Sequence, residues 1–313
     1  MEPRQLREFL AILECGSLSD AARRLGILQP NLTKSLQSLE RTIGGALFIR
    51  TKLGMKATAL GLSLEPRARV ILREIDRADQ EIAEIVNGTQ GRVVVGTGPS
   101  FANAILPRAI ARFRARHPRI ETVVIDGLYP QLVPKVKNGE LDFACCNGTA
   151  LADGELAGES LLANEPTVIV TRAQNPLTRK RNITIQQIST EPWLLPVKLE
   201  PLRRQFENVF VKAHLPLPTP VLECPSYFLV KEILHENDIL TLFNRLMVQD
   251  EIERGVLKTI AVPEFEWPLD YHAIYRRDVP MTRAAQMFLA EIQAVCNDYR
   301  KRVKNLAPRP RQR

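Results

Sequence analysis

The sequence predicts an α/β fold with an N-terminal winged helix-turn-helix, one long helix, and a larger half of alternating strands and helices. Three observations predict it. Short amphipathic helices surround a glycine turn in residues 1–61, a heptad pattern follows in residues 58–88, and short apolar runs alternate with amphipathic stretches over residues 91–300. A chain of 313 residues with 45% apolar residues has the length and composition of a globular protein of about two domains.

Residues 1–61 contain three short helical patterns followed by a hairpin. Apolar residues recur at helical spacing in residues 4–14, 19–25 and 29–43, with Ser19 expected to cap the second helix and Gly26 to end it. Two helices joined by a tight glycine turn are typical of a helix-turn-helix. The stretch "ALFIRTKLGMKAT" then predicts a two-stranded wing that turns at residues 52–54.

The exposed face of the third helix carries amides and hydroxyls instead of the usual mixture of Glu and Lys. The second helix of such a motif enters the major groove of DNA, where Asn, Gln, Ser and Thr can hydrogen-bond to base edges. Lys and Arg in this helix and in the wing suit phosphates. The alternative is a three-helix cap without a role in DNA binding. The candidate DNA-binding residues are Gln29, Pro30, Asn31, Thr33, Lys34, Arg50 and Lys52.

Residues 58–88 predict a linker helix with an apolar seam. The apolar positions alternate between spacings of four and three, which is the a/d pattern of a coiled coil over three heptads. Packing against the helix's own domain is the alternative to a second chain. Pro66 is expected to kink the helix or to mark its start, and "NGTQG" at 87–91 predicts a hinge. The heptad seam consists of Leu64, Ala68, Ile71, Ile75, Ala78, Ile82 and Ile85.

Beyond the hinge, short apolar runs alternate with helical stretches at 105–116, 130–138 and 201–213. This alternation predicts an α/β domain over residues 91–300 with largely parallel sheets, and its length allows two subdomains. The runs that predict strands are 92–98, 121–127, 141–148, 167–172, 192–196, 221–224, 239–243, 257–262 and 271–277.

The net charge of +8 is concentrated at the C-terminal end. Seven of the 43 basic residues lie in residues 300–313, and without them 36 basic residues face 35 acidic ones. Residues 301–313 are therefore expected to be a disordered basic tail. The N-terminal segment is the better indication of a nucleic-acid partner, because residues 1–61 hold nine basic and five acidic side chains.

Several classes of protein are disfavoured by composition. No secretion signal or apolar run long enough for a membrane span is seen, so a cytoplasmic protein without membrane contact is expected. The five cysteines form no CxxC pair and the four histidines lie far apart, so we expect neither a metal nor another cofactor.

These N-terminal motifs together resemble the LysR-type transcriptional regulators. The resemblance is carried by residues 6–51 and 58–61 and continues more loosely through "VVVGTG", "ILPRAIARFRARHPRIE" and "VKNGELDFA". Leu28 departs from it, because the family usually has a capping Ser there, and so do Asp238 and Phe243 in a segment that is usually Gly-rich. The matching motifs are Ala21–Ala22, Gln29–Pro30, Leu39–Glu40, Leu47–Phe48 with Arg50, and Thr58 with Gly61.

The resemblance implies a winged helix-turn-helix, a dimerising linker helix and a periplasmic-binding-protein-like effector domain of two subdomains. It implies a transcriptional regulator that binds operator DNA and responds to a small-molecule effector. The expected assembly is a homodimer through the linker helix, and then a tetramer. RNA polymerase is a further candidate partner.

The effector is expected at the carboxyl ends of the strands of this domain. Backbone N–H groups near residues 100–103, where a strand leads into a helix, form a natural site for an organic anion. In relatives, the effector touches the positions corresponding to Ser100 and Phe101. The candidate effector-binding residues are Ser100, Phe101, Leu128, Asn147, Pro196, Lys198 and Thr241.

Two other functions need consideration. "GTGPSF" with Asp126 resembles the start of a dinucleotide-binding fingerprint, but Phe101 stands where the third glycine belongs, and no catalytic set is recognisable. A nucleotide- or small-molecule-binding enzyme of the α/β class is the alternative function. These two observations disfavour it, so we expect no enzymatic activity. Cys145 and Cys146 suggest a redox sensor, although adjacent residues in an apolar strand point to opposite faces and favour two buried structural thiols.

Overall fold

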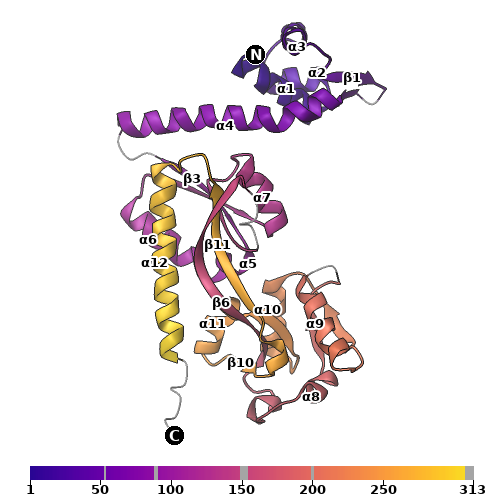
Figure 1. Ribbon diagram of the computed structural model, residues 1–313, viewed down its shortest axis with the longest axis vertical. Coiled ribbons are helices and arrows are strands. Elements are labelled where there is room, and N and C mark those ends of the chain that lie inside the picture. Colours follow the sequence, from indigo (N-terminus) through magenta and orange to yellow (C-terminus); the bar gives the residue numbers. More distant parts are fainter. Residues whose placement is uncertain (53, 88–90, 149–153, 199–200, 307–313) are drawn as a thin grey trace.

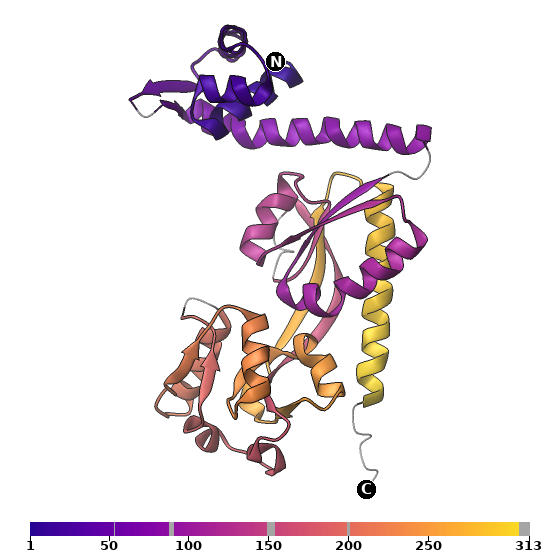
Figure 2. The same cartoon turned by 180° about the vertical axis from the view of Figure 1, so that it is seen from behind.

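The structure is a computed structural model that describes residues 1–52, 54–87, 91–148, 154–198 and 201–306. Figure 1 shows a small N-terminal domain, a long helix α4 (Ala59–Asn87) and a C-terminal domain with two lobes. Both Figure 1 and Figure 2 show α4 lying across the end of the upper lobe. None of the helices in the described part of the chain combines the length and apolar content that crossing a bilayer requires.

The N-terminal domain is the predicted winged helix-turn-helix. Gly16, Gly26 and Gly44 end its three helices in the left-handed conformation, which glycine adopts without steric cost. Ser17, and not the expected Ser19, caps the second helix through the amide of Asp20. The elements are α1 (Pro3–Cys15), α2 (Leu18–Leu25), α3 (Gln29–Ile43), β1 (Phe48–Thr51) and β2 (Gly54–Ala57).

Helix α4 begins at Ala59 and continues through Pro66, so this proline does not mark its start. The first part of the heptad seam packs within the chain: Ala68 is fully buried in the N-terminal core, and Leu64 packs against that core. Further along, Ile71 and Ile82 are 37% and 59% exposed. The expected hinge lies mainly at residues 88–90, outside the described residues.

The C-terminal domain is built on one seven-stranded sheet that runs through both lobes, with the strand order β10-β6-β11-β5-β3-β4 and β9 paired to β6. The two long strands β6 (Leu156–Arg172) and β11 (Pro268–Arg276) pair over both lobes. We name the upper lobe subdomain I and the lower lobe subdomain II. The other strands are β3 (Arg92–Thr97), β4 (Glu121–Asp126), β5 (Phe143–Asn147), β7 (Trp193–Leu195), β8 (Pro220–Glu223), β9 (Thr241–Asn244) and β10 (Leu257–Ile260).

The expectation of largely parallel sheets is correct only in part. Strands β3, β4 and β5 of subdomain I are parallel, and so are β7 and β8. The pairs made by β6 and β11 are antiparallel. The reason is topological: β6 carries the chain from subdomain I into subdomain II and β11 brings it back, so the two run in opposite directions.

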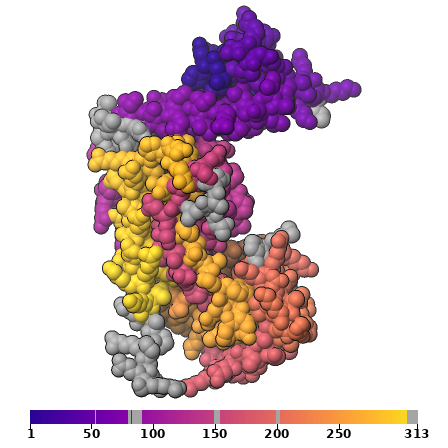
Figure 3. Space-filling model, in the orientation of Figure 1, coloured from indigo at the N-terminus to yellow at the C-terminus, as the bar shows by residue number. Residues whose placement is uncertain are grey.

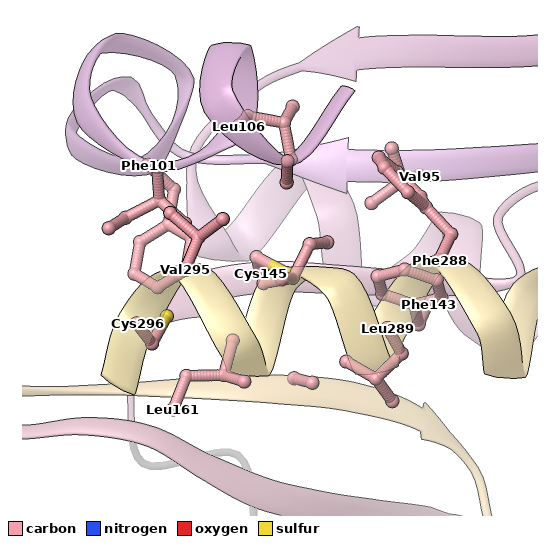
Figure 4. Close-up of a cluster of buried hydrophobic side chains, with 14 of the residues drawn as sticks. Val95, Phe101, Leu106, Phe143, Cys145, Leu161, Phe288, Leu289, Val295 and Cys296 are labelled. Atoms are coloured by element: carbon pink, nitrogen blue, oxygen red, sulfur yellow. The ribbon is translucent and has the colours of Figure 1, made fainter. Parts of the chain in front are cut away.

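Helices cover the sheet in both lobes. Subdomain I has α5 (Pro99–Ala104), α6 (Leu106–Arg116), α7 (Tyr129–Lys137) and α12 (Arg283–Leu306); subdomain II has α8 (Ile185–Ser189), η2 (Pro176–Arg179), α9 (Pro201–Lys212), α10 (Tyr227–Glu236), α11 (Arg245–Glu253) and η3 (Pro263–Phe265). In the largest core cluster, Phe288 and Leu289 of α12 pack with Phe143 and Val95 of the sheet (Figure 4).

Helix α12 corrects the expected start of the basic tail. Residues 301–306 continue this helix, whereas the tail was expected to be disordered from residue 301. Val303 packs against the core of subdomain I, and Arg302 forms ion pairs with Asp250 and Glu253. These contacts hold the added turn in place, and the rest of the tail lies outside the described residues.

Candidate nucleic-acid interface and effector cleft

Helix α3 places its polar face on the surface of the N-terminal domain. Leu32, Leu36 and Leu39 are buried in the core, while Gln29 and Asn31 are exposed. Leu28, at the N-cap, offers no side-chain acceptor, as its apolar character predicts. The missing cap is partly offset because Pro30 has no N–H group and the amides of Asn31 and Leu32 donate to the Leu28 carbonyl.

Two side-chain hydrogen bonds organise the start of α3. The Ser19 hydroxyl donates to Gln29 Oε1 at 3.1 Å, and the Thr33 hydroxyl donates to the Gln29 carbonyl at 3.0 Å. Gln29 is left with its NH₂ group as a donor, and the half-buried Thr33 is left with its lone pairs. Ser19 was not among the predicted DNA-binding residues, although it orients one of them.

The wing projects beside α3 as the two-stranded hairpin β1–β2. Its strands are tied to two different helices of the domain. Glu40 at the end of α3 accepts the Leu47 and Phe48 amides, and the Met55 amide donates to the Gly16 carbonyl at 2.7 Å. A side chain at Gly54 would collide with that carbonyl, since its Cβ would lie 2.4 Å away. Only glycine permits this close approach.

The cations of this surface are available to a polyanion. Lys34, Arg50, Lys52 and Lys56 are exposed, and none makes an ion pair within the part of the chain that the structure describes. Elsewhere in the domain, Arg24 is paired with Glu14. Unpaired cations on a surface that also carries exposed amides are the combination that phosphate and base contacts require.

The C-terminal domain has a cleft of about 430 Å³ between its subdomains. Asn103 of α5 crosses from one wall to the other, donating from its side-chain amide to the Met247 carbonyl at 3.0 Å. The cleft is lined by Pro99, Ala102, Asn103 and Asp126 from subdomain I and by Pro225, Ser226, Tyr227, Phe228, Lys231 and Met247 from subdomain II.

The predicted effector residues are only partly gathered here. Ser100, between the cleft-lining Pro99 and Ala102, is half-buried and shares a side-chain hydrogen bond with Tyr271. Phe101 is fully buried in the core with its ring 5.1 Å from that of Tyr271, so it can offer only its backbone to the cleft. Pro196 and Thr241 are buried and line a small cavity that shares Pro225 and Tyr227 with the cleft.

The remaining three candidates, Leu128, Asn147 and Lys198, are exposed and do not line this cleft. The sequence did not indicate that α10 forms one wall of the cleft. The charged group there is Lys231, which is 8% exposed and pairs with Glu251 at 2.8 Å. The sequence pattern of α10 is that of an ordinary amphipathic helix, and only the tertiary fold brings α10 opposite α5.

The cysteine pair of β5 is buried. Cys145 lies in the core that contacts α12, whereas Cys146 lies in the core beneath α7, so the two point to opposite faces as expected. Burial raises the pKa of the Cys145 thiol well above its ordinary value and raises that of Cys146 to about 12. Because the thiolate is the reactive form, both groups are poorly suited to peroxide sensing.

Comparison with known proteins agrees with this division of the chain. Residues 3–62 match the bacterial regulatory helix-turn-helix protein model of the lysR family, and residues 87–297 match the LysR substrate binding domain model. The HTH-type transcriptional regulator GalR of Pseudomonas putida is 29% identical over 83% of this chain and 65% of its own length.

Solved structures show the same fold. A full-length OxyR variant from Pseudomonas aeruginosa matches with a TM-score of 0.67 and 20% identity over 94% of this chain and 95% of that one. Full-length CbnR in complex with its target DNA matches with a TM-score of 0.65 and 17% identity over 94% of this chain and all of that one. The chain therefore belongs to the LysR family of DNA-binding transcriptional regulators, a non-enzymatic family, and it carries that family's effector-binding domain.

Proposed function

We propose that this regulator reads double-stranded DNA with α3 and the wing, and that a small organic anion bound between its subdomains modulates that activity. The single observation that carries the DNA part is the surface described above. Exposed amides at the start of α3 accompany four exposed cations on α3 and the wing that have no acidic partner among the described residues. Such a surface suits DNA in two ways. Its amides can hydrogen-bond to base edges, and its cations can neutralise phosphates and release their counterions.

The test of DNA binding starts from a pool of random duplexes. The full chain is used to select the duplexes that it binds, and their affinity is then measured against salt beside a scrambled control. We expect clear preference for the selected sequence and a logarithmic affinity that falls linearly with the logarithm of salt concentration. Equal binding to both duplexes would contradict sequence-specific recognition.

The effector part of the proposal is supported by backbone donors at the start of α5 that have no acceptor within that helix. Helix α5 begins at Pro99, and the amide of Ala102 is its first to find a helical acceptor, the Gly98 carbonyl. The amides of Ser100 and Phe101 therefore have no partner within the helix. Backbone N–H groups at a strand-to-helix turn favour an anion. Lys231 supplies positive charge from the opposite wall, and its ion-pair partner Glu251 reduces the net charge there.

The test of the effector is a screen followed by one variant. Small organic anions are screened for those that raise the unfolding temperature of the full chain and change its affinity for the selected duplex. Ser100→Glu would place a fixed negative charge beside the two donors and should abolish the response. Ser160→Glu, on an exposed part of β6, is the matched control and should keep the response. A cationic effector, or an undiminished response in Ser100→Glu, would overturn this assignment.

We further propose a dimer through α4 and a tetramer through a second contact. The exposed part of the heptad seam, with Ile71 and Ile82, supports the first because a lone helix leaves these side chains in water. The second is supported by exposed apolar side chains elsewhere. Val124 lies on the edge strand β4, and Phe228 on α10 is 75% exposed. RNA polymerase stays a candidate partner of the assembled regulator.

A further inference from the structure

Helix α4 carries a row of charges that is shared with subdomain I of the same chain. Arg276 at the end of β11 lies 2.5 Å from Glu74, Glu74 lies 3.7 Å from Arg77, and Arg77 lies 2.7 Å from Asp142. The signs alternate along this row, so each charge has an opposite neighbour. We call these four residues the α4 latch. The space-filling view shows α4 seated on subdomain I (Figure 3).

Most of the α4 latch is removed from water. The side chains of Arg77, Asp142 and Arg276 are 13%, 10% and 11% exposed. The second oxygen of Asp142 accepts the amide of Val94 at 2.8 Å, which fixes the carboxylate to strand β3. Shielding from water and a fixed geometry distinguish these pairs from ordinary surface ion pairs, which contribute little.

Besides the α4 latch, α4 makes a contact with its own domain and carries the exposed part of the heptad seam. With 3.6 residues per turn, Arg77 lies more than a quarter turn around the helix from Ile71 and Ile82, whereas Glu74 is a neighbour of Ile71. Ala68 and Leu72, one turn apart, are buried in the N-terminal core. One helix can therefore hold its own DNA-binding domain, present a seam to a second chain and rest on subdomain I.

We propose that the α4 latch is a releasable contact that holds the DNA-binding domain in one orientation relative to the effector-binding domain. Both sides of this contact are rich in charge. If α4 lifts away, the ion pairs are lost and water solvates the separated charges. The regulator can then populate a closed and an open state, and a ligand that binds one of them better shifts the balance between them.

The latch is also connected to the cleft by a single strand. Strand β11 contains Tyr271, whose side chain shares a hydrogen bond with that of Ser100 beside the cleft. The same strand ends at Arg276, which belongs to the latch. Between them, β11 is paired with β5 and β6 on both sides, so it moves as part of the sheet. The link to an effector rests on the proposed function. The latch itself does not, since none of its four residues lines the cleft.

Hydrogen exchange of the ligand-free full chain tests the latch directly. Arg77→Gln should accelerate amide exchange severalfold in peptides covering 68–79 and 138–146, because it leaves the shielded Asp142 without its ion-pair partner. Arg67→Gln is the matched control: it lies on the same helix, is exposed, and makes no ion pair within the described residues. It should exchange like the unchanged chain.

A double-mutant cycle separates the contact from general destabilisation. Glu74→Gln and Arg276→Gln should together accelerate exchange less than the product of their single effects, by about twofold or more. Multiplicative effects, or exchange in Arg77→Gln equal to that in Arg67→Gln, would overturn the latch. Failure of duplex selection would instead overturn the proposed DNA binding and leave these exchange results standing, so the two failures can be told apart.

Discussion

The carboxylate of Glu40 accepts the amide of Leu47 at 2.7 Å, and the amide of Phe48 lies 3.4 Å from the same oxygen. This contact joins the last turn of α3 to the first residues of the wing. It sets the position of Arg50 relative to the start of α3, so the spacing of phosphate and base contacts depends on a residue that need not touch DNA.

Replacing Glu40 with Leu should therefore weaken binding to all duplexes. Two partly buried amides would lose their acceptor, which costs about 1–3 kcal/mol of folding free energy. Affinity for selected and scrambled duplexes and the free energy of unfolding by urea are to be measured together. Glu40→Gln, which keeps an acceptor oxygen, is the control and should lose much less. Equal losses in both variants would show that the negative charge, and not the hydrogen bonds, sets the position of the wing.

Asn31 is the predicted base-reading residue that is least engaged within the protein. Its side chain is exposed, whereas Gln29 and Thr33 both form hydrogen bonds with neighbours. Asn31→Ala should reduce discrimination between selected and scrambled duplexes by roughly 1–3 kcal/mol. Lys34→Ala should weaken both duplexes alike and lower the salt slope by about one unit. Titrations at several salt concentrations distinguish the two patterns, and a uniform loss in Asn31→Ala would exclude base reading by this residue.

Ile82→Asp should split the α4 dimer without unfolding the chain. Ile82 is 59% exposed within one chain, so a carboxylate there is hydrated in the monomer. In a coiled coil it would be buried without a partner, at a cost of several kcal/mol. Sedimentation at micromolar concentration measures the outcome. Leu62→Asp, also exposed but on the opposite side of the helix from the heptad seam, is the control and should leave the assembly intact.

Glu165 predicts a dependence of stability on pH. Burial raises the pKa of this carboxyl above its ordinary value, and the hydrogen bond from Tyr299 only partly opposes the shift. A group with a raised pKa in the folded state stabilises the fold below its unfolded pKa and loses that contribution as the pH rises through the folded value. Glu165→Gln, which resembles the protonated form, should therefore be more stable than the unchanged chain at neutral pH.

The measurement is the free energy of unfolding by urea at neutral pH and at a pH below the ordinary carboxyl range. The advantage of Glu165→Gln should disappear at the lower pH. Glu232→Gln, at an exposed position of α10, is a comparison that should show no such change between the two conditions. A Glu165→Gln variant that is less stable at neutral pH would mean that the charged carboxylate is favoured at this site.

The sequence by itself determined the elements and the family. The glycine turns, the heptads and the alternation of short apolar runs located the winged helix-turn-helix, α4 and most of the strands, because each signal lies within a few neighbouring residues. The run 167–172 indicated only the last part of β6 (Leu156–Arg172). The polar face of α3 was visible for the same reason, since residues 29–38 occupy one helix and their periodicity states which side is buried.

Only the tertiary structure decided how α4 divides its surface and which residues line the cleft. The heptad pattern made Ala68 and Ile82 equivalent, yet Ala68 is enclosed by its own domain and Ile82 is exposed. Lys231 and Asn103 share the cleft although they are far apart in the chain, and Phe101, adjacent to that cleft in sequence, turns its ring into the core. Periodicity reports which side of an element is apolar. It does not report what packs there, because that depends on where the chain folds back.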